Sequence, residues 1–228
     1  MRINKLNLII TLLFLALPVI SFGQQADYIW SPGLSYSWKS SDRWAYYTKV
    51  DLFNSLNEAG SSQFIQHVEP SLSFAYSWSV RTKIGGGYKY RLAEPFESGY
   101  QYEHRFLQQI GFISYFGERR ISHRVRLEQR FRSSSYQNRL RYRLSYDLPL
   151  EGERLDPGEK YLILSNEMMT AFNADEADSE NRALAGLGWY LNSRRKIELT
   201  LQYRTQDIFS DEGIEHLLRV GSVFYLNR

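Results

Sequence analysis

The chain is 228 residues long, which is enough for one domain with a sizeable core. It contains no cysteine, so a disulfide-stapled secreted fold and a lipidated cysteine are both excluded. Its 17 tyrosines, 13 phenylalanines and 5 tryptophans and its net charge of +3 describe a polar chain rich in aromatic rings, a composition that fits strands with one apolar face.

Residues 1–23 have the organisation of a secretory signal peptide. Arg2 and Lys5 precede the uncharged run LNLIITLLFLALPVI, which is shorter than the ~20 residues of a membrane-spanning helix. Small residues follow this run and predict cleavage between Gly23 and Gln24. We therefore expect an exported protein, located in the bacterial outer membrane.

The mature domain, residues 24–228, is nearly neutral. Removing Arg2 and Lys5 from the 28 basic residues leaves 26, against 25 acidic residues. A nucleic-acid binder usually shows a clear basic excess on one face, so we expect no nucleic-acid partner.

Apolar and polar side chains then alternate with a period of two, as they do in half-buried strands. The segments RWAYYTKVDLF, KIGGGYKYRL and KIELTLQYR show this alternation clearly. About eleven such segments have lengths that suit tilted membrane strands. Because single-chain bacterial barrels have even strand numbers, we predict 10–12 strands. Counting ADYIW, the segment before Pro32, as a separate strand gives twelve, which is slightly favoured.

The predicted connections alternate between two kinds. Tight turns are expected near residues 40–42, 79–80, 117–119 and 192–194, with a longer turn of the same phase at 152–158. Looser polar loops are expected at 55–62, 93–99, 133–135, 173–181 and 209–213. Short turns at one rim and longer loops at the other are typical of outer-membrane barrels, whose short turns are periplasmic.

These patterns predict an all-β fold, an antiparallel up-and-down transmembrane β-barrel. Trp44, Trp78 and Trp189 lie toward segment ends on the apolar face, where interfacial aromatic girdles are found. The alternative is a soluble periplasmic β-sandwich or lipocalin-like barrel that binds an anionic ligand. The polar face carries one charge after another in register, which suits an enclosed lumen better.

The stretch HRVRLEQRFRSSSYQNRLRYRLSY places arginines at every second position of two neighbouring strands. The arginines that share the polar phase are Arg124, Arg126, Arg130, Arg132, Arg139, Arg141 and Arg143. A charge that faces lipid near the bilayer midplane costs about 2–4 kcal/mol, so these side chains are expected to face the lumen.

Like charges directly opposite one another destabilise a sheet, so this basic ladder needs partners. Carboxylates of the inward phase are available at Asp51, Glu69, Glu103, Glu128, Glu167, Glu198 and Glu215. The leading interpretation is a salt-bridged lumen. The sharper hypothesis is a lumen that attracts or binds a small anion.

The sequence offers little catalytic chemistry. Its four histidines lack the spacing of a metal site, and GGGYKY lies in a strand pattern without the helix that a phosphate loop requires. His67 and Glu69 share a face, as a base and its orienting group would, but no nucleophile motif such as GxSxG is present. We assign no catalytic residue, no metal and no cofactor.

The signal, the early Trp30 and the segments HRVRLEQRF, RLRYRLSYDLPL, LILSNEMM and IELTLQYR…HLLRVGSVFYL resemble an uncharacterised outer-membrane family, domain of unknown function 2490. The residues that carry the resemblance are Arg124, Arg126, Glu128, Arg130, Phe131, Arg139, Arg141, Arg143, Pro149, Leu150 and Glu167. The resemblance implies a small outer-membrane β-barrel and implies no activity. The chain departs from the usual barrel ending, because it continues past Phe224 and Tyr225 to Asn227 and Arg228.

The sequence therefore predicts a Gram-negative outer-membrane, porin-like barrel that is structural, or that binds or passes small solutes or anions. Expected partners are outer-membrane lipid, lipopolysaccharide, a small anion and the barrel-insertion machinery. The alternative function is an enzyme that modifies lipid or lipopolysaccharide at the outer leaflet.

Overall fold

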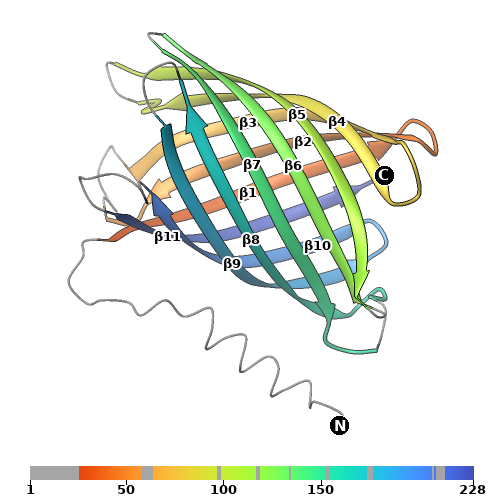
Figure 1. The fold of residues 1–228 in the computed structure, drawn as a ribbon. Helices are drawn as coiled ribbons and strands as arrows, with labels where there is room; N and C mark the ends of the chain where they lie inside the picture. The colour runs from red at the N-terminus through yellow and green to blue at the C-terminus, as the bar shows by residue number, and fades with distance from the viewer. Residues whose placement is uncertain are drawn as a thin grey trace.

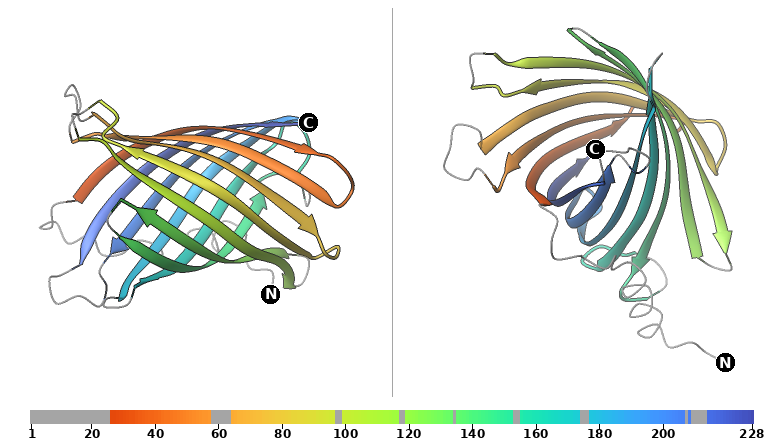
Figure 2. Two further views of the ribbon diagram at one scale, coloured as in Figure 1. Left: turned by 90° about the horizontal axis from the view of Figure 1, so that it is seen from above. Right: turned by 60° about the vertical axis from the view of Figure 1, so that its left-hand side comes forward.

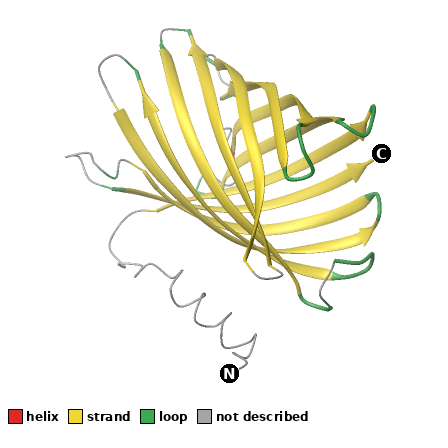
Figure 3. Cartoon of the chain, turned by 45° about the vertical axis from the view of Figure 1, so that its right-hand side comes forward, coloured by secondary structure: helices red, strands yellow, loops and turns green. Residues whose placement is uncertain are grey.

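The computed structural model describes residues 26–57, 64–96, 99–116, 119–133, 135–152, 155–173, 177–206, 208 and 214–228. These residues form eleven strands (Figure 3). The strands are β1 (Ala26–Lys39), β2 (Trp44–Ser55), β3 (Ile65–Ser77), β4 (Thr82–Ala93), β5 (Gln101–Phe116), β6 (Arg119–Arg132), β7 (Tyr136–Pro149), β8 (Lys160–Phe172), β9 (Ala177–Asn192), β10 (Arg195–Gln206) and β11 (Glu215–Asn227). No helix among the described residues is long and apolar enough to cross a membrane. The predicted signal peptide lies outside these residues.

The eleven strands close into one barrel of strongly tilted strands (Figures 1 and 2). Each strand pairs antiparallel with its neighbour in the chain, and β1 closes the barrel by pairing parallel with β11. The predicted all-β barrel is confirmed, and the strand count falls inside the predicted range of 10–12.

Pro32 does not divide β1, so the strand number is eleven and not twelve. The segment before this proline is not a separate strand, because β1 continues through it and pairs with β11 on both sides. On the other edge, the β1–β2 pairing skips Ser31 and Pro32, where proline has no N–H to donate to a ladder. The slight preference for twelve strands assumed antiparallel closure, and the parallel β1–β11 pair removes the need for an even number.

The connections divide between two ends of the barrel, which we name the turn end and the loop end. The turn end carries the connections at residues 40–43, 78–81, 117–118, 150–159 and 193–194, and the loop end carries those at 56–64, 94–100, 133–135, 173–176 and 207–214. Each predicted connection thus lies at the end of the barrel to which the alternation assigned it. One predicted loop, 173–181, is shorter than expected, because β9 already begins at Ala177. The chain ends at the turn end (Figure 1).

The two faces of the barrel wall have opposite chemistry. Large apolar side chains point outward and are exposed, with Leu187 at 55% and Leu199 at 57%. Charged side chains point inward and are buried, and the largest fully buried ones are Glu69, Glu128 and Glu167. The barrel interior is therefore a polar core enclosed by an apolar wall, and its charged groups form the candidate site.

Candidate functional site

Two neighbouring strands, β6 and β7, set arginine against arginine inside the barrel. In their register Arg124 lies opposite Arg143, and Arg126 lies opposite Arg141. Like charges in directly opposed positions destabilise a sheet, so these four guanidiniums depend on carboxylates from other positions.

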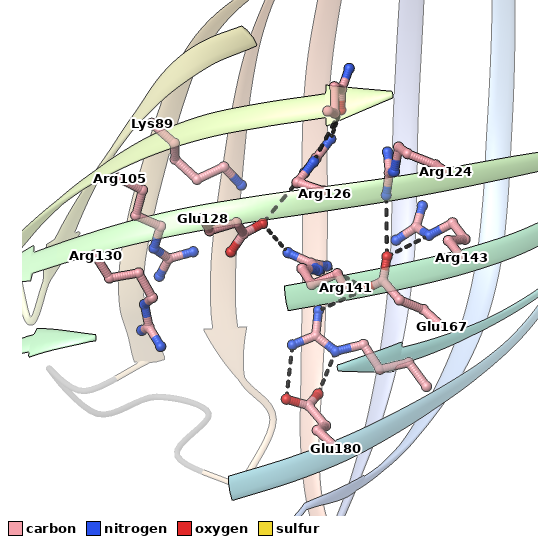
Figure 4. Close-up of polar contacts among 12 residues, drawn as sticks. Lys89, Arg105, Arg124, Arg126, Glu128, Arg130, Arg141, Arg143, Glu167 and Glu180 are labelled. Atoms are coloured by element: carbon pink, nitrogen blue, oxygen red, sulfur yellow. Dashed lines mark hydrogen bonds and ion pairs between the residues drawn. The ribbon is translucent and has the colours of Figure 1, made fainter. Parts of the chain in front are cut away.

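Glu167, on β8, is the main carboxylate partner of these arginines (Figure 4). Its Oε2 accepts hydrogen bonds from Arg143 Nε at 2.8 Å and from Arg124 Nη2 at 3.2 Å. Its Oε1 pairs with the Arg141 guanidinium and lies 3.7 Å from Arg182 Nη1 of β9. Four arginines from three strands thus converge on a single carboxylate that is 1% exposed.

Two further glutamates extend this cluster. Arg141 also donates from Nη1 to Glu128 Oε1 at 2.5 Å, and Arg126 Nη1 lies 3.6 Å from the same oxygen. Glu180 of β9 pairs with Arg182 and lies 4.0 Å from Arg204 Nε. We call the whole set the Glu167 network; its members are Arg124, Arg126, Arg141, Arg143, Arg182, Arg204, Glu128, Glu167 and Glu180. In it, six guanidiniums share three carboxylates, which leaves three positive charges without a carboxylate.

A second cluster lies nearer the loop end. Glu103 of β5 accepts two hydrogen bonds from Arg130, at 2.9 and 2.7 Å, and one from Arg132 at 2.7 Å, and it also pairs with Arg105. Arg105 Nη2 lies 3.4 Å from Glu69 Oε1 of β3.

The same Glu69 binds two more cations from β4. Lys89 Nζ donates to it at 2.7 Å and Arg91 Nε at 2.5 Å. We call this set the Glu103 network; its members are Lys89, Arg91, Arg105, Arg130, Arg132, Glu69 and Glu103. Five cations share two carboxylates there, so both networks carry more positive than negative charge.

Arg139 and Arg219 are inward arginines that lie outside both networks. Arg139 has no carboxylate within ion-pair distance among the described residues, and its Nε is buried without a hydrogen-bond partner there. Arg219 of β11 donates to the Ser31 hydroxyl at 2.7 Å and lies 4.4 Å above the Phe53 ring. Their charges add to the positive surplus of the interior.

The remaining predicted carboxylates also lie in strands of the barrel. Asp51 is buried and pairs with Lys49 at 2.8 Å. Glu198 pairs with Lys196 at 2.5 Å and accepts the hydroxyls of two tyrosines. Glu215, at the loop end, accepts a hydrogen bond from Gln206 at 3.1 Å. All seven predicted arginines and all seven predicted carboxylates therefore occupy inward strand positions, and the structure joins most of them in two networks.

Sequence reasoning missed Glu180 and Arg182 as members of the site. Both lie in β9 and point inward, where Glu180 is opposite Met169 and Arg182 is opposite Glu167. Glu180 was placed in a predicted loop at 173–181. The signal that could have found both residues is their spacing of two, which continues the inward phase of the strand that follows.

The tyrosines bound to Glu198 give a stability prediction at the turn end. Tyr161 is 2% exposed and donates its hydroxyl to Glu198 at 2.7 Å, and a Cβ at Gly188 would fall on its ring. We expect Gly188→Ala to lower the free energy of unfolding by about 1–3 kcal/mol, because the extra methyl overpacks this site. Gly111→Ala is the matched control, since its Cβ would meet only the His123 carbonyl at 3.5 Å. Thermal unfolding should separate the two variants, and equal midpoints would contradict the prediction.

The four histidines lie apart from one another in the barrel wall. His67 Nε2 lies 3.8 Å from Glu69 Oε1, and its ring stacks on Phe53 with centroids 4.0 Å apart. The other three lie on the outward phase, where His104, His123 and His216 each share a hydrogen bond with a tyrosine hydroxyl. Among the described residues no group of three or more histidines and acids could hold a metal ion.

Comparison with known proteins adds one match to this geometry. The family model described as "Protein of unknown function (DUF2490)" matches residues 29–214, which covers strands from β1 to β10 and ends just before β11. No curated protein matches the chain.

Proposed function

The chain belongs to the DUF2490 family of proteins of unknown function, and from the chemistry of its two faces we propose that it is a bacterial outer-membrane β-barrel whose arginine-rich interior holds small anions. The proposal joins a location, argued from the outward face, to a function, argued from the interior.

The location rests on one observation, the inverted polarity of the barrel. Outward strand positions among the described residues carry charge only at Arg119, Lys160 and Arg195, each the first residue of a strand at the turn end. Between the rims this face is apolar, aromatic or uncharged. A band of this kind matches the lipid-facing wall of an outer-membrane barrel, whereas a protein in water would bury it.

Aromatic rings at the turn end support the same location. On the outer face of β1, β2 and β3, Trp38 stacks on Tyr46 with centroids 5.4 Å apart, and Trp44 contacts Tyr76 at 5.0 Å. Aromatic girdles mark the membrane interfaces of such barrels, and their short turns are periplasmic. Outer-membrane lipid and lipopolysaccharide would then surround the wall, and the barrel-insertion machinery would be the partner in assembly.

The anion-holding function rests on the interior surplus of cations. In the Glu167 and Glu103 networks eleven cationic groups share five carboxylates. Enclosed charge of one sign raises the local concentration of ions of the opposite sign. The apolar wall makes this attraction stronger than it would be on a surface in contact with water.

Expression of the full chain in a Gram-negative host tests the location. We expect the protein in the outer-membrane fraction, with a gel mobility that changes on boiling because a closed barrel resists detergent until it is heated. A protein that remains in the periplasmic extract without detergent would overturn the location. The phosphate and chloride experiment described below tests the anion-holding function separately.

A further inference from the structure

Within the Glu167 network, the arginines differ in how many of their donors are used. A guanidinium has five N–H donors. Arg141 engages all three of its nitrogens with Glu128 and Glu167. Arg124 and Arg143 each make one hydrogen bond, and both go to the same oxygen, Glu167 Oε2. Most donors of these two facing guanidiniums therefore have no protein partner among the described residues (Figure 4).

Water can reach these two arginines. The side chains of Arg124 and Arg143 are 27% and 29% exposed, against 10% for Arg141 and 2% for Glu167. Short side chains follow these arginines toward the turn end. Ser122, Ser145 and Ser165 lie side by side there on β6, β7 and β8. Among the described residues their hydroxyls make no side-chain hydrogen bond, so small polar groups without a side-chain partner lie between the arginines and the turn end.

The charge of this pair suits an anion with more than one negative charge. Arg124 and Arg143 are directly opposed, and their network lacks three carboxylates. A phosphate group carries about −1.5 to −2 at neutral pH and has three acceptor oxygens. Planar guanidinium forks bind such oxygens two at a time. We propose that Arg124 and Arg143 form a binding site for the phosphate group of a small solute inside the barrel, an inference that rests on the anion-holding interior proposed above.

The two ends of the barrel differ in charge, and this difference indicates the end from which a phosphate group would enter. Each end is taken as the described residues of its connections together with the two terminal residues of every strand there. The turn end has eleven basic residues: Lys39, Arg43, Arg81, Lys83, Arg119, Arg120, Lys160, Arg194, Arg195, Lys196 and Arg228. Its acids are Asp42, Glu151, Asp156 and Glu159.

The loop end shows the opposite balance. Among its described residues Arg132 is basic, and Asp27, Glu94, Asp178 and Glu215 are acidic. A cationic mouth focuses anions toward it, and an acidic mouth repels them. The phosphate group therefore approaches from the turn end, the side on which Ser122, Ser145 and Ser165 lie next to the arginines.

The test is a titration of the purified full-length barrel in detergent with inorganic phosphate and, separately, with glycerol phosphate, each followed by phosphorus NMR line broadening. We expect Arg143→Gln to weaken phosphate binding by about ten-fold or more, since it removes charged hydrogen bonds. Arg143→Lys keeps the charge and the fold but loses the planar fork, so we expect it also to weaken binding by about several-fold. Binding of inorganic phosphate alone identifies a free ion as the ligand, and binding of both probes shows that the site accepts a phosphate ester.

Arg132→Gln is the matched control. It removes one inward guanidinium from the Glu103 network, at the other end of the barrel, and should leave the phosphate dissociation constant within about two-fold. Equal losses in Arg143→Gln and Arg132→Gln, or full binding by Arg143→Lys, would show a diffuse cationic interior and overturn the site. Chloride binding, measured in parallel by line broadening, separates the two proposals. Chloride bound without phosphate overturns the site alone, and neither ion bound overturns the anion-holding interior as well.

Discussion

Replacing Glu167 by glutamine is expected to lower the free energy of unfolding of the barrel by about 3–5 kcal/mol, because it breaks a buried charge network by removing its negative partner. Arg124, Arg141, Arg143 and Arg182 all lie within ion-pair distance of this carboxylate. Glutamine keeps the size and one acceptor oxygen, so the loss reports charge and not volume. Urea unfolding of the protein in lipid vesicles provides the measurement.

Asp147→Asn is the matched control for this substitution. Asp147 points inward from β7 but makes no ion pair among the described residues, so its neutralisation should cost little. The double variant Glu167→Gln with Arg143→Gln removes one of the uncompensated cations and should recover part of the lost stability, because neighbouring charges couple. If Glu167→Gln were as mild as Asp147→Asn, the Glu167 network would not hold the interior together.

The fold could be predicted from the sequence because a strand encodes its two faces directly. In β10, every second residue of KIELTLQYR is apolar, and the structure places Leu199 and Leu201 outward and Glu198 inward. The phase of each strand therefore follows from local sequence. The way in which the barrel closes does not. About eleven alternating segments could be counted, but the parallel pairing of β1 with β11 that an odd number requires is a contact between distant segments, which alternation does not encode.

The candidate site could be predicted to the same extent, in which side chains face inward but not in how they pair. The inward phase of Arg124, Arg141 and Arg143 follows from their spacing of two. Their partners do not, because ion pairs form along the strands as well as across them. Arg141 contacts Glu167 two residues beyond its register neighbour Met169. Such diagonal contacts depend on side-chain rotamers, which alternation does not encode. The same limit applies to Arg139, which faces Glu128 in register although the Glu128 carboxylate pairs with Arg141 instead.

An arginine on the outward face is expected to have an effect nearly as large as the loss of Glu167. Leu201 is the seventh residue of the twelve in β10, points outward and lies between Ala185 and Val220 of the neighbouring strands. If this face contacts lipid, Leu201→Arg should lower the free energy of unfolding in vesicles by about 2–4 kcal/mol, the cost of a cation near the bilayer midplane. Unfolding in urea, with the fraction of barrel inserted in cells as a second readout, measures this loss.

Thr205→Arg places the same side chain on the same strand and face, one position from the strand end. Its neighbours there are the polar Asn181 and His216, and the cost of a cation should fall to about 0–1 kcal/mol near the interface. The difference in unfolding free energy between the two variants therefore measures how deep each position lies in the membrane, since both variants add the same charge to an outward position. A barrel in water gives no such difference, because Leu201→Arg would then replace an exposed leucine by a soluble side chain at little cost. Equal stability of the two variants would place the outward face in water and overturn the membrane location, while the interior networks would remain as they are.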